Sequence, residues 1–508
     1  MLITCLVYLE AAIATDEAMD SLTLVSQLSE VRSSDWVFQA LQLLAERYGC
    51  LSGSSDGTYR GNLTLSRYEF ASGLNACLNQ INQLIASRET SVTQADLATL
   101  QKLQEAFATE LATLCSQVDA LEARSTTVEA QSFSTTTKLH GQIILAATDT
   151  FGDRVGAQSN QSNASFAYRT RLNLETSFTG KDLLRVRLES GNFGSSLAVT
   201  GTNMTRLNFD RNTNGQVVLP HLLYRFPIGT VSIAIGTTGE GYTDITDTVT
   251  PPTIADDSRG VPSRFGEYSS LYRQNGGGIG VNWNITPDLK LTLGYLAGTP
   301  SSPIQKNGLF NGGFNALAQF VYTHKRGAVG IAYSRLYAPG GRVDLTGSVG
   351  SLLASQPFGN AIATSGNTLS IQGFHQFTPK LQVHGWVGYT RAEAESSGLS
   401  QLSDGQGGSL VQQVEKGSSA DLWYGAIAFT FPDVGGKGNL PGLLIGLPPH
   451  ITRGDIRRSA TSLHIEAFYR FQVNDFISIT PGFWLVTNPE NSSNATQYVG
   501  VIRASFNF

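Results

Sequence analysis

The sequence predicts a mainly β protein: an antiparallel transmembrane β-barrel of about 16 strands, preceded by a small α-helical domain and a coiled-coil helix. Three observations lead to this fold class. The last residues, from Tyr498 to Phe508, alternate in polarity and end on an aromatic residue. Many earlier segments alternate in the same way, and a period of two places successive side chains on opposite faces of a strand. Finally, only 15% of the 508 residues are charged, against roughly 25% in soluble domains.

The composition suits strands, turns and aromatic girdles more than membrane helices. The chain has 53 Gly and 25 Phe but only 3 Met and 4 Cys. No run approaches the roughly 18 apolar residues of a membrane helix. The net charge of −5 divides into −9 for residues 1–137 and +4 for residues 138–508. This acidic N-terminal part, with no basic run, argues against a nucleic-acid partner.

Residues 1–14 form a short apolar stretch that ends in Ala12-Ile13-Ala14. This A-x-A pattern resembles the end of a secretory signal peptide. The basic n-region is missing and Glu10 interrupts the apolar residues, so we expect the remnant of a signal whose true start lies upstream. An ordinary buried N-terminal segment is the alternative.

Residues 22–82 carry two stretches of helical periodicity around a loop. Apolar residues fall at helical spacing from Trp36 to Leu44. The loop from Gly53 to Asn62 is rich in turn residues. Ser66, with Glu69 three residues later, forms a capping box that begins the second helix. We therefore expect a small α-helical unit.

This unit resembles one S-layer homology (SLH) domain. The matching pieces are Leu28-Ser29-Glu30-Val31, Trp36, Tyr48-Gly49-Cys50, Asp56-Gly57-Thr58-Tyr59-Arg60 and Leu65-Ser66-Arg67-Tyr68-Glu69-Phe70-Ala71. The resemblance implies that cell-wall polymer, either peptidoglycan or a polysaccharide linked to it, binds at Asp56, Gly57, Thr58, Arg67 and Glu69. Ser66 stands where the family has Thr, and one copy is present where S-layer proteins usually carry three. From the residues alone, Arg67 could pair with an anionic glycan group, or Arg67 and Glu69 could only brace the helix.

Two cysteines, Cys50 and Cys77, fall in the SLH-like unit. An exported protein can oxidise such a pair. We expect a disulfide that joins the loop to the second helix; buried free thiols are the alternative. Cys115 is left without a partner in this scheme.

Residues 91–130 repeat in heptads. One series carries Leu100, Phe107, Leu114, Leu121 and Val128, and its companion carries Leu97, Gln104, Leu111, Val118 and Ser125. A repeat sustained over about four heptads predicts a coiled coil. A single amphipathic helix packed on the barrel is the alternative. A coiled coil before a barrel indicates a rigid stalk and favours a homotrimer.

From residue 138 to residue 508 the pattern changes to period two. Alternating segments include 166–178, 184–189, 289–295 and 463–472, and turn signals between strands include Thr286-Pro287-Asp288 and Thr378-Pro379-Lys380. At roughly 20–25 residues per strand and connection, this part fits about 16 strands, with about 14 or 18 as alternatives. A barrel of that size encloses an aqueous channel. A soluble β-sandwich, whose strands also alternate, is the competing fold.

The order of these parts is similar to that of the cyanobacterial outer-membrane proteins called iron-uptake porins, whose barrel is of the carbohydrate-selective OprB type. Pro262-Ser263-Arg264-Phe265-Gly266, followed by Leu271-Tyr272-Arg273, matches a stretch typical of that group. The resemblance implies passive diffusion of small hydrophilic solutes, either inorganic ions, iron among them, or sugars. It also implies an outer-membrane location, contact with its lipid, and an N-terminal part in the periplasm.

Two successive predicted strands place charged residues on one face. These residues are Arg169, Arg171, Arg185 and Arg187, with Glu175 and Glu189. If this face lines the pore, the arginines attract anions or stack on hydroxylated solutes. A charge-balanced wall without preference is the alternative.

The stretch Gly236–Gly278 has the longest loop chemistry near the middle of the barrel. Its charged residues include Asp244, Asp247, Asp256, Asp257, Arg259, Arg264, Glu267 and Arg273. A loop this long is usually functional or disordered. We expect it to fold into the lumen and form the constriction, with acids facing arginines across the pore. A loop at the cell surface is the alternative.

Nothing in the sequence indicates an enzyme, and no cofactor is expected. The chain has no Gly-x-Ser-x-Gly, no P-loop, no H-x-x-x-H and no C-x-x-C. Asp256 and Asp257 lack the spaced oxygen ligands that a hard cation needs, so we expect no metal site there. The competing function is a structural tether between outer membrane and cell wall, with a poorly conducting barrel.

Overall fold

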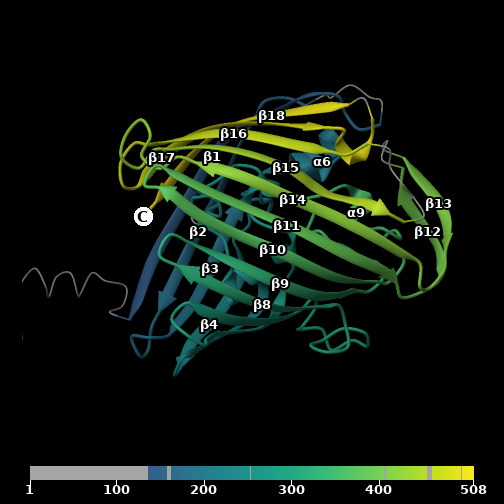
Figure 1. Cartoon of the computed structure of the whole chain (residues 1–508), viewed down its shortest axis with the longest axis horizontal. Helices are drawn as coiled ribbons and strands as arrows, with labels where there is room; N and C mark the ends of the chain where they lie inside the picture. The colour runs from purple at the N-terminus through teal and green to yellow at the C-terminus, as the bar shows by residue number, and fades with distance from the viewer. Residues whose placement is uncertain (1–135, 157–161, 252, 405–407, 455–459, 494) are drawn as a thin grey trace, which may run out of the picture. The chain divides into compact units, whose positions relative to one another are not determined.

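The computed structural model describes residues 136–508, except 157–161, 252, 405–407, 455–459 and 494. The expected signal remnant, SLH-like unit and coiled coil, with Cys50 and Cys77, lie outside the described residues. The described residues belong to a unit that begins after Phe133. They form a closed antiparallel barrel of 16 strands (Figure 1), as the alternation predicted.

The barrel strands follow one another around the ring in chain order, and β1 pairs with β18 to close it. They are β1 (Thr137–Gly152), β2 (Ser165–Thr176), β3 (Leu183–Gly191), β4 (Val218–Ile228), β5 (Val231–Gly241), β6 (Asn275–Asn284), β7 (Leu289–Ala297), β8 (Phe314–His324), β9 (Gly327–Ala338), β10 (Thr364–Thr378), β11 (Leu381–Ala394), β14 (Ser419–Thr430), β15 (Leu440–Arg453), β16 (Leu463–Gln472), β17 (Ile477–Thr487) and β18 (Thr496–Asn507). A separate hairpin of β12 (Gly398–Ser403) and β13 (Ser409–Val414) lies in the connection from β11 to β14. The alternation did not predict this hairpin.

The helices of the described residues are short and lie in the loops. They are α6 (Ser196–Thr200), η4 (Asn203–Thr205), α7 (Tyr242–Ile245), α8 (Arg264–Glu267), η5 (Ser270–Arg273), α9 (Leu352–Ser355) and η6 (Pro489–Asn491). Within the described ranges, no helix has both the length and the apolar character that a membrane crossing requires.

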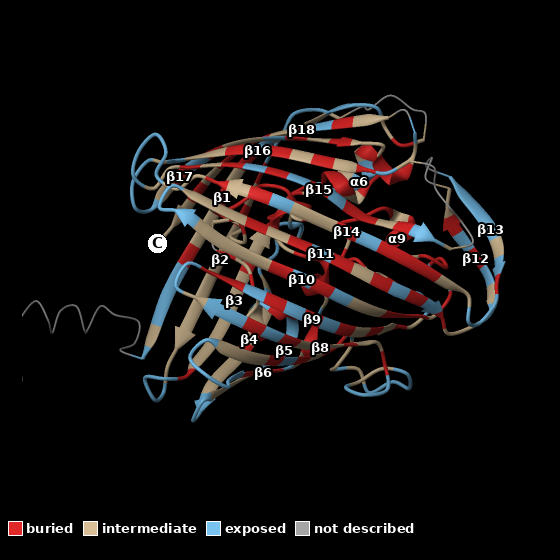
Figure 2. Cartoon of the chain, in the orientation of Figure 1, coloured by how far each residue is buried: buried red, intermediate tan, exposed pale blue. Residues whose placement is uncertain are grey.

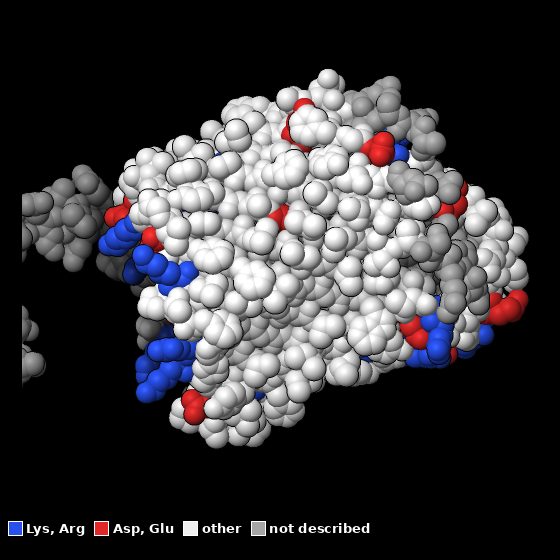
Figure 3. All heavy atoms as spheres, turned by 45° about the horizontal axis from the view of Figure 1, so that its top comes forward, with Lys and Arg blue, Asp and Glu red and all other residues white. Residues whose placement is uncertain are grey.

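The outer face of the barrel carries an apolar band. Phe320, Ile331, Ile371 and Val387 stand in register across four successive strands, β8 to β11. Each of these side chains is between 45% and 54% exposed. Their sequence neighbours point inward and are buried, which gives the alternating bands along the strands in Figure 2. Figure 3 shows a mostly uncharged outer wall with charged residues gathered toward its ends, as a lipid-facing surface requires.

The two ends of the barrel differ. At one end the strands are joined by short turns, such as 229–230, 325–326 and 379–380. At the other end the connections are long, such as 192–217 and 242–274. Thr137 and the C-terminus both lie at the short-turn end, where the backbone of Phe508 pairs with that of Gly141 (Figure 1).

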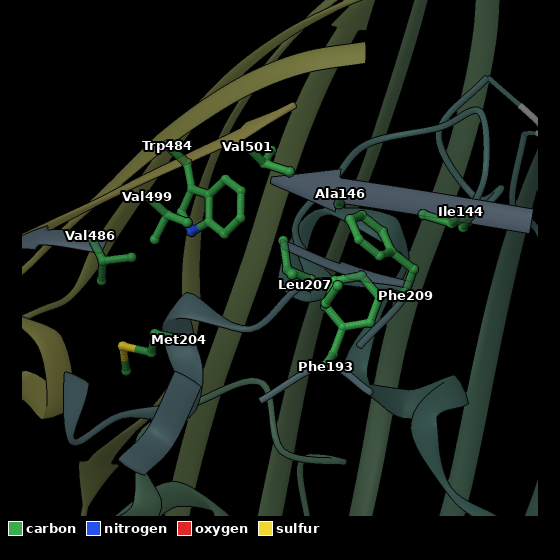
Figure 4. Packing of buried hydrophobic residues seen from close by; sticks show 11 residues of the cluster. Ile144, Ala146, Phe193, Met204, Leu207, Phe209, Trp484, Val486, Val499 and Val501 are labelled. Atoms are coloured by element: carbon green, nitrogen blue, oxygen red, sulfur yellow. The ribbon is translucent and has the colours of Figure 1, made fainter. Parts of the chain in front are cut away.

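The last strand has the two faces that its sequence predicted. Ile502 on the outer face is 57% exposed, whereas Arg503 beside it is fully buried. Val499 and Val501 also point inward, although they are apolar. Figure 4 shows the reason, because Met204, Leu207 and Phe209 from the connection between β3 and β4 reach this part of the wall and complete a buried cluster.

One boundary differs from the sequence-based expectation. The loop expected at 236–278 is shorter, because β5 continues to Gly241 and β6 begins at Asn275. After Gly236 the strand leaves β4 and a register shift carries it on along β6 alone. There the side chain of Glu240 accepts the N–H of Leu222 on β4, a residue that pairs with β3 but has no register partner on β5.

Candidate functional site

The connection from β5 to β6, residues 242–274, is called the inner segment here because it contacts strands on opposite sides of the ring. Arg503 on β18 donates to its backbone at Gly260 over 2.6 Å. The hydroxyl of Tyr272, near the C-terminal end of the segment, accepts a hydrogen bond from the side-chain amide of Gln372 on β10 over 2.7 Å. Strands β18 and β10 lie far apart in the order of the ring. The segment therefore crosses the inside of the barrel.

Ser263 attaches the middle of the inner segment to β16. Its N–H donates to Oε1 of Glu466 over 2.9 Å, and its hydroxyl donates to Oε2 of the same carboxylate. The hydroxyl also accepts the N–H of Gly266 over 3.0 Å and so caps α8. A Cβ at Gly266 would lie 2.8 Å from Glu466 Oε2 and 2.9 Å from Ser263 Oγ, so a larger residue would displace the two groups that form this contact. The stretch Pro262–Gly266 is thus the anchor of the inner segment.

Asp257 brings the inner segment against the arginines of β2. Its Oδ2 lies 2.9 Å from Nη2 of Arg169, and it also pairs with Arg171. Arg503 donates to the carbonyl of Asp257 over 2.9 Å. Arg169 and Arg503 are almost wholly buried. Acid and arginines are therefore in contact here, and not on opposite sides of an open gap as the sequence suggested.

The remaining charged residues of β2 and β3 share one face and pair across the strands. Arg171 pairs with Glu189, which also lies 2.8 Å from Arg211. Arg185 lies 2.8 Å from Glu175. Arg187 donates to the side chain of Asn173 over 2.8 Å. Among these, only Arg187 has an uncharged partner, so arginine charge exceeds carboxylate charge on this wall.

The other expected constriction residues are spread along the inner segment. Asp247 lies between Arg225 on β4 and Lys290 on β7. Asp256 accepts the N–H groups of Ser258 and Arg259 within one turn. The further contacts are Arg259 with the carbonyl of Asp475, Arg264 with the carbonyl of Gly347, Arg273 with Glu267 and with the ring of Tyr268, and Asp244 with the N–H of Gly241. The structure brings Asp257 alone of this set to the β2 arginines.

Two carboxyls of the inner segment differ in their proton affinity. Burial alone would raise the pKa of Asp257, but Arg169 and Arg171 outweigh it and hold this pKa well below its usual range. For Glu267 burial dominates and raises the pKa to about 7, although Arg273 opposes the shift from 3.2 Å. Asp257 is therefore ionised at neutral pH, whereas Glu267 gains or loses its proton near pH 7.

Two further connections pack inside the ring with the inner segment. Leu207, from the connection 192–217, forms a β-bridge with Ser263. The connection 339–363 reaches Glu490, whose carboxylate accepts the N–H of Leu352 over 2.6 Å and the hydroxyl of Thr202 over 2.6 Å. The sequence predicted one inner loop, whereas the connections 192–217 and 339–363 also contribute and are joined by Glu490 of the connection 488–495.

Sequence reasoning missed several interior residues of this site. Arg503 belongs to the alternating last strand but was not predicted at the constriction. Its contacts come from residues 257–260, some 240 positions away along the chain. Glu466 and His464 are fully buried beneath Ser263. Their alternation with apolar residues in β16 was the available signal. The expected wall-binding residues Asp56, Gly57, Thr58, Arg67 and Glu69 lie outside the described residues.

Comparison with protein families gives one match over most of the chain. A model described as "Carbohydrate-selective porin, OprB family" matches residues 94–508. An uncharacterized protein of Synechocystis sp. is 54% identical over 502 residues, which span 96% of this chain and 92% of that protein. An uncharacterized protein of Nostoc sp. is 37% identical over 522 residues, 97% of this chain and 86% of that protein.

Two other similarities are partial or distant. Outer membrane protein SlpA of Thermus thermophilus is 36% identical over 110 residues, 21% of this chain and 12% of that protein. Among solved structures, a high-pH structure of Pseudomonas putida OprB covers 73% of this chain and 94% of its own, with 13% identity and a TM-score of 0.49.

Proposed function

Because the chain belongs to the OprB family of carbohydrate-selective porins, we propose that it lets small hydrophilic solutes diffuse through a barrel narrowed by its inner segment. The observation that carries the proposal is the contact between Asp257 and the arginines of β2. Charged side chains held rigidly inside a barrel form the kind of polar constriction that selects among solutes. The other two inner connections, 192–217 and 339–363, narrow the passage further.

The solutes we propose are sugars and inorganic ions, with iron among the ions. The β2–β3 wall favours sugars and anions within this range. Arg187 has an uncharged partner, and Arg169 and Arg171 share the single carboxylate of Asp257. Surplus guanidinium groups attract anions and bind hydroxyl groups through their planar donors.

We further propose that residues 22–82 hold the barrel to the cell wall through Asp56, Gly57, Thr58, Arg67 and Glu69. The strand β1 begins at the short-turn end of the barrel. In outer-membrane barrels, short turns face the periplasm. The chain preceding β1 would then enter the periplasm, where the cell wall lies.

The anchoring proposal is tested by sedimentation of the purified full-length protein with isolated cell wall. Wild-type protein should sediment with the wall, and Arg67→Ala should reduce the bound fraction several-fold. Arg326→Ala, in the turn between β8 and β9, is the control for a lost charge. Equal sedimentation of wild type and Arg67→Ala would remove Arg67 from the proposed contact.

A trimer is part of the same proposal, with residues 91–130 as the coiled-coil stalk. Single-channel recording in a planar bilayer tests conduction and assembly together. Wild-type protein should open in steps, grouped in threes, and a salt gradient should give a reversal potential of the anion-selective sign. Folded protein that never opens would contradict the porin and favour the tether with a closed barrel.

A further inference from the structure

His221, Glu240 and Asp244 meet where the inner segment leaves the barrel wall. Nδ1 of His221 lies 3.1 Å from Oε2 of Glu240 and 3.7 Å from Oδ2 of Asp244. All three atoms fall within 4.8 Å of one another. The residues come from β4, the end of β5 and α7, so no short sequence motif contains them.

The charge of this cluster is unbalanced. Three other acids of the barrel interior have two cationic partners each: Asp257 has two arginines, Glu189 has two, and Asp247 has Arg225 and Lys290. Glu240 and Asp244 instead share one imidazole, and among the described residues no Arg or Lys forms an ion pair with either carboxylate. Two carboxylates around one imidazole leave net negative charge even if that imidazole is protonated.

This surplus lies in an enclosed place. Glu240 is fully buried, and its other oxygen is already occupied by the N–H of Leu222 at 3.0 Å. Asp244 is oriented by the N–H of Gly241 at 3.0 Å. Buried negative charge is costly without a cation beside it. A cation bound among the three residues would remove that cost.

The nearby arginines do not fill this place. Arg225 donates to the backbone carbonyl of Asp244 over 2.7 Å and directs another nitrogen to Asp247. Arg187 stands opposite His221 in the β3–β4 register but donates to Asn173. No arginine therefore occupies the carboxylate oxygens that face Nδ1 of His221. Oδ2 of Asp244 accepts one hydrogen bond, from the N–H of Gly241, and keeps a second lone pair for a small ion.

We propose that His221, Glu240 and Asp244 bind a divalent first-row transition-metal ion such as Zn²⁺. Bonds of about 2.1 Å to imidazole nitrogen and carboxylate oxygen place tetrahedral ligand atoms about 3.4 Å apart. The observed 3.1 Å and 3.7 Å fall on either side of this value. The side chains of His221 and Asp244 are 14% and 18% exposed, which leaves room for water as a fourth ligand. Metal binding at this site does not require an open channel, so it can be tested without a conductance measurement.

Calorimetric titration of the purified full-length protein with Zn²⁺ tests the site. All cysteines are alkylated first, because thiolates of residues 1–135 could bind the same ion. Wild type should bind one more Zn²⁺ per chain than His221→Ala, and Asp244→Asn should bind this ion at least ten-fold more weakly. His450→Ala is the matched control, because His450 faces a backbone carbonyl and no carboxylate. Equal binding by wild type and His221→Ala would overturn the proposal.

A second measurement needs no variant and so does not depend on their folding. X-ray absorption of the Zn²⁺-loaded, alkylated wild type should give a first shell of nitrogen and oxygen with the scattering of a single imidazole. A shell without imidazole would overturn the proposal. Tighter binding of Ca²⁺ than of Zn²⁺ would also overturn it, since a hard cation prefers oxygen ligands alone.

Discussion

At the scale of single residues, Asp257 sets the charge that a solute meets beside β2. It pairs with Arg169 and Arg171, and its backbone carbonyl receives Arg503. Removing its carboxylate charge would leave the guanidinium groups of Arg169 and Arg171 without this partner. The residue that balances the wall therefore belongs to the inner segment and not to the wall itself.

Replacing Asp257 with Asn should make the channel more anion-selective. Two unit charges about 4 Å apart interact by about 1 kcal/mol in water, which corresponds to a roughly five-fold effect, so we expect a two- to five-fold rise in the anion-to-cation permeability ratio. The reversal potential in a salt gradient measures it. Asp475→Asn, in the exposed turn between β16 and β17, should leave the ratio unchanged. An unchanged ratio in Asp257→Asn would mean that solutes do not pass this group.

Glu267 should make the stability of the inner segment depend on pH. Its pKa in the folded protein is raised to about 7 from an ordinary 4.5. The folded state therefore binds the proton more tightly, and the associated stability is full below about pH 4.5 and lost as the pH rises through 7. Between these limits, the wild type should lose about 3 kcal/mol of unfolding free energy relative to Glu267→Gln. Denaturant titrations of both proteins at acid and at mildly alkaline pH measure this; parallel curves would contradict it.

At the scale of elements, strands and inner connections differ in how far the sequence predicts them. Each barrel strand repeats a period of two, so 166–178 and 463–472 could be recognised one at a time and match β2 and β16. The inner segment has no such local rule. Its position depends on single contacts, such as Ser263 with Glu466, between residues two hundred positions apart. The length of β5 likewise depends on the contact of Glu240 with Leu222.

Deleting Asp244–Asp257 should raise single-channel conductance. This deletion removes the first half of the inner segment, including the contact with Arg169 and Arg171, and leaves the anchor at Ser263 in place. Deletion of residues 301–308, in the largely exposed connection between β7 and β8, is the control and should not change the conductance. A conductance equal to that of the wild type would show that the segment does not limit the pore.

At the scale of the whole molecule, the alternation, the composition and the terminal strand were sufficient to predict a closed barrel. A wall between lipid and water requires every strand to alternate apolar residues on its outer face with polar residues on its inner face. The strand number was also predicted correctly, since it follows from chain length. The contacts of the inner segment and the contribution of the connections 192–217 and 339–363 were not predicted, because they follow no sequence period. The hairpin of β12 and β13 was missed as well. It forms a separate two-stranded sheet within a connection, and so it does not follow the rule that applies to the strands of the ring.

An arginine in the middle of the apolar band should destabilise the barrel far more than one near its edge. Ile371 lies in register with the band, whereas Phe377 on the same face of β10 lies next to a short turn. We expect Ile371→Arg to cost about 2–4 kcal/mol and Phe377→Arg about 0–1 kcal/mol. Denaturant titration in lipid vesicles measures both. Equal costs would place the hydrocarbon core elsewhere on the wall.

The seam between β1 and β18 also determines when the barrel can be completed. It joins Gln142 to Asn507, which lie at the two ends of the barrel sequence. A growing chain therefore carries an unpaired strand edge until its final residues have been made, and such edges pair readily with other chains. Contacts between distant parts of a sequence also form slowly. Losing β18 would leave the sequence of every other strand intact and still leave β1 without the partner that closes the ring.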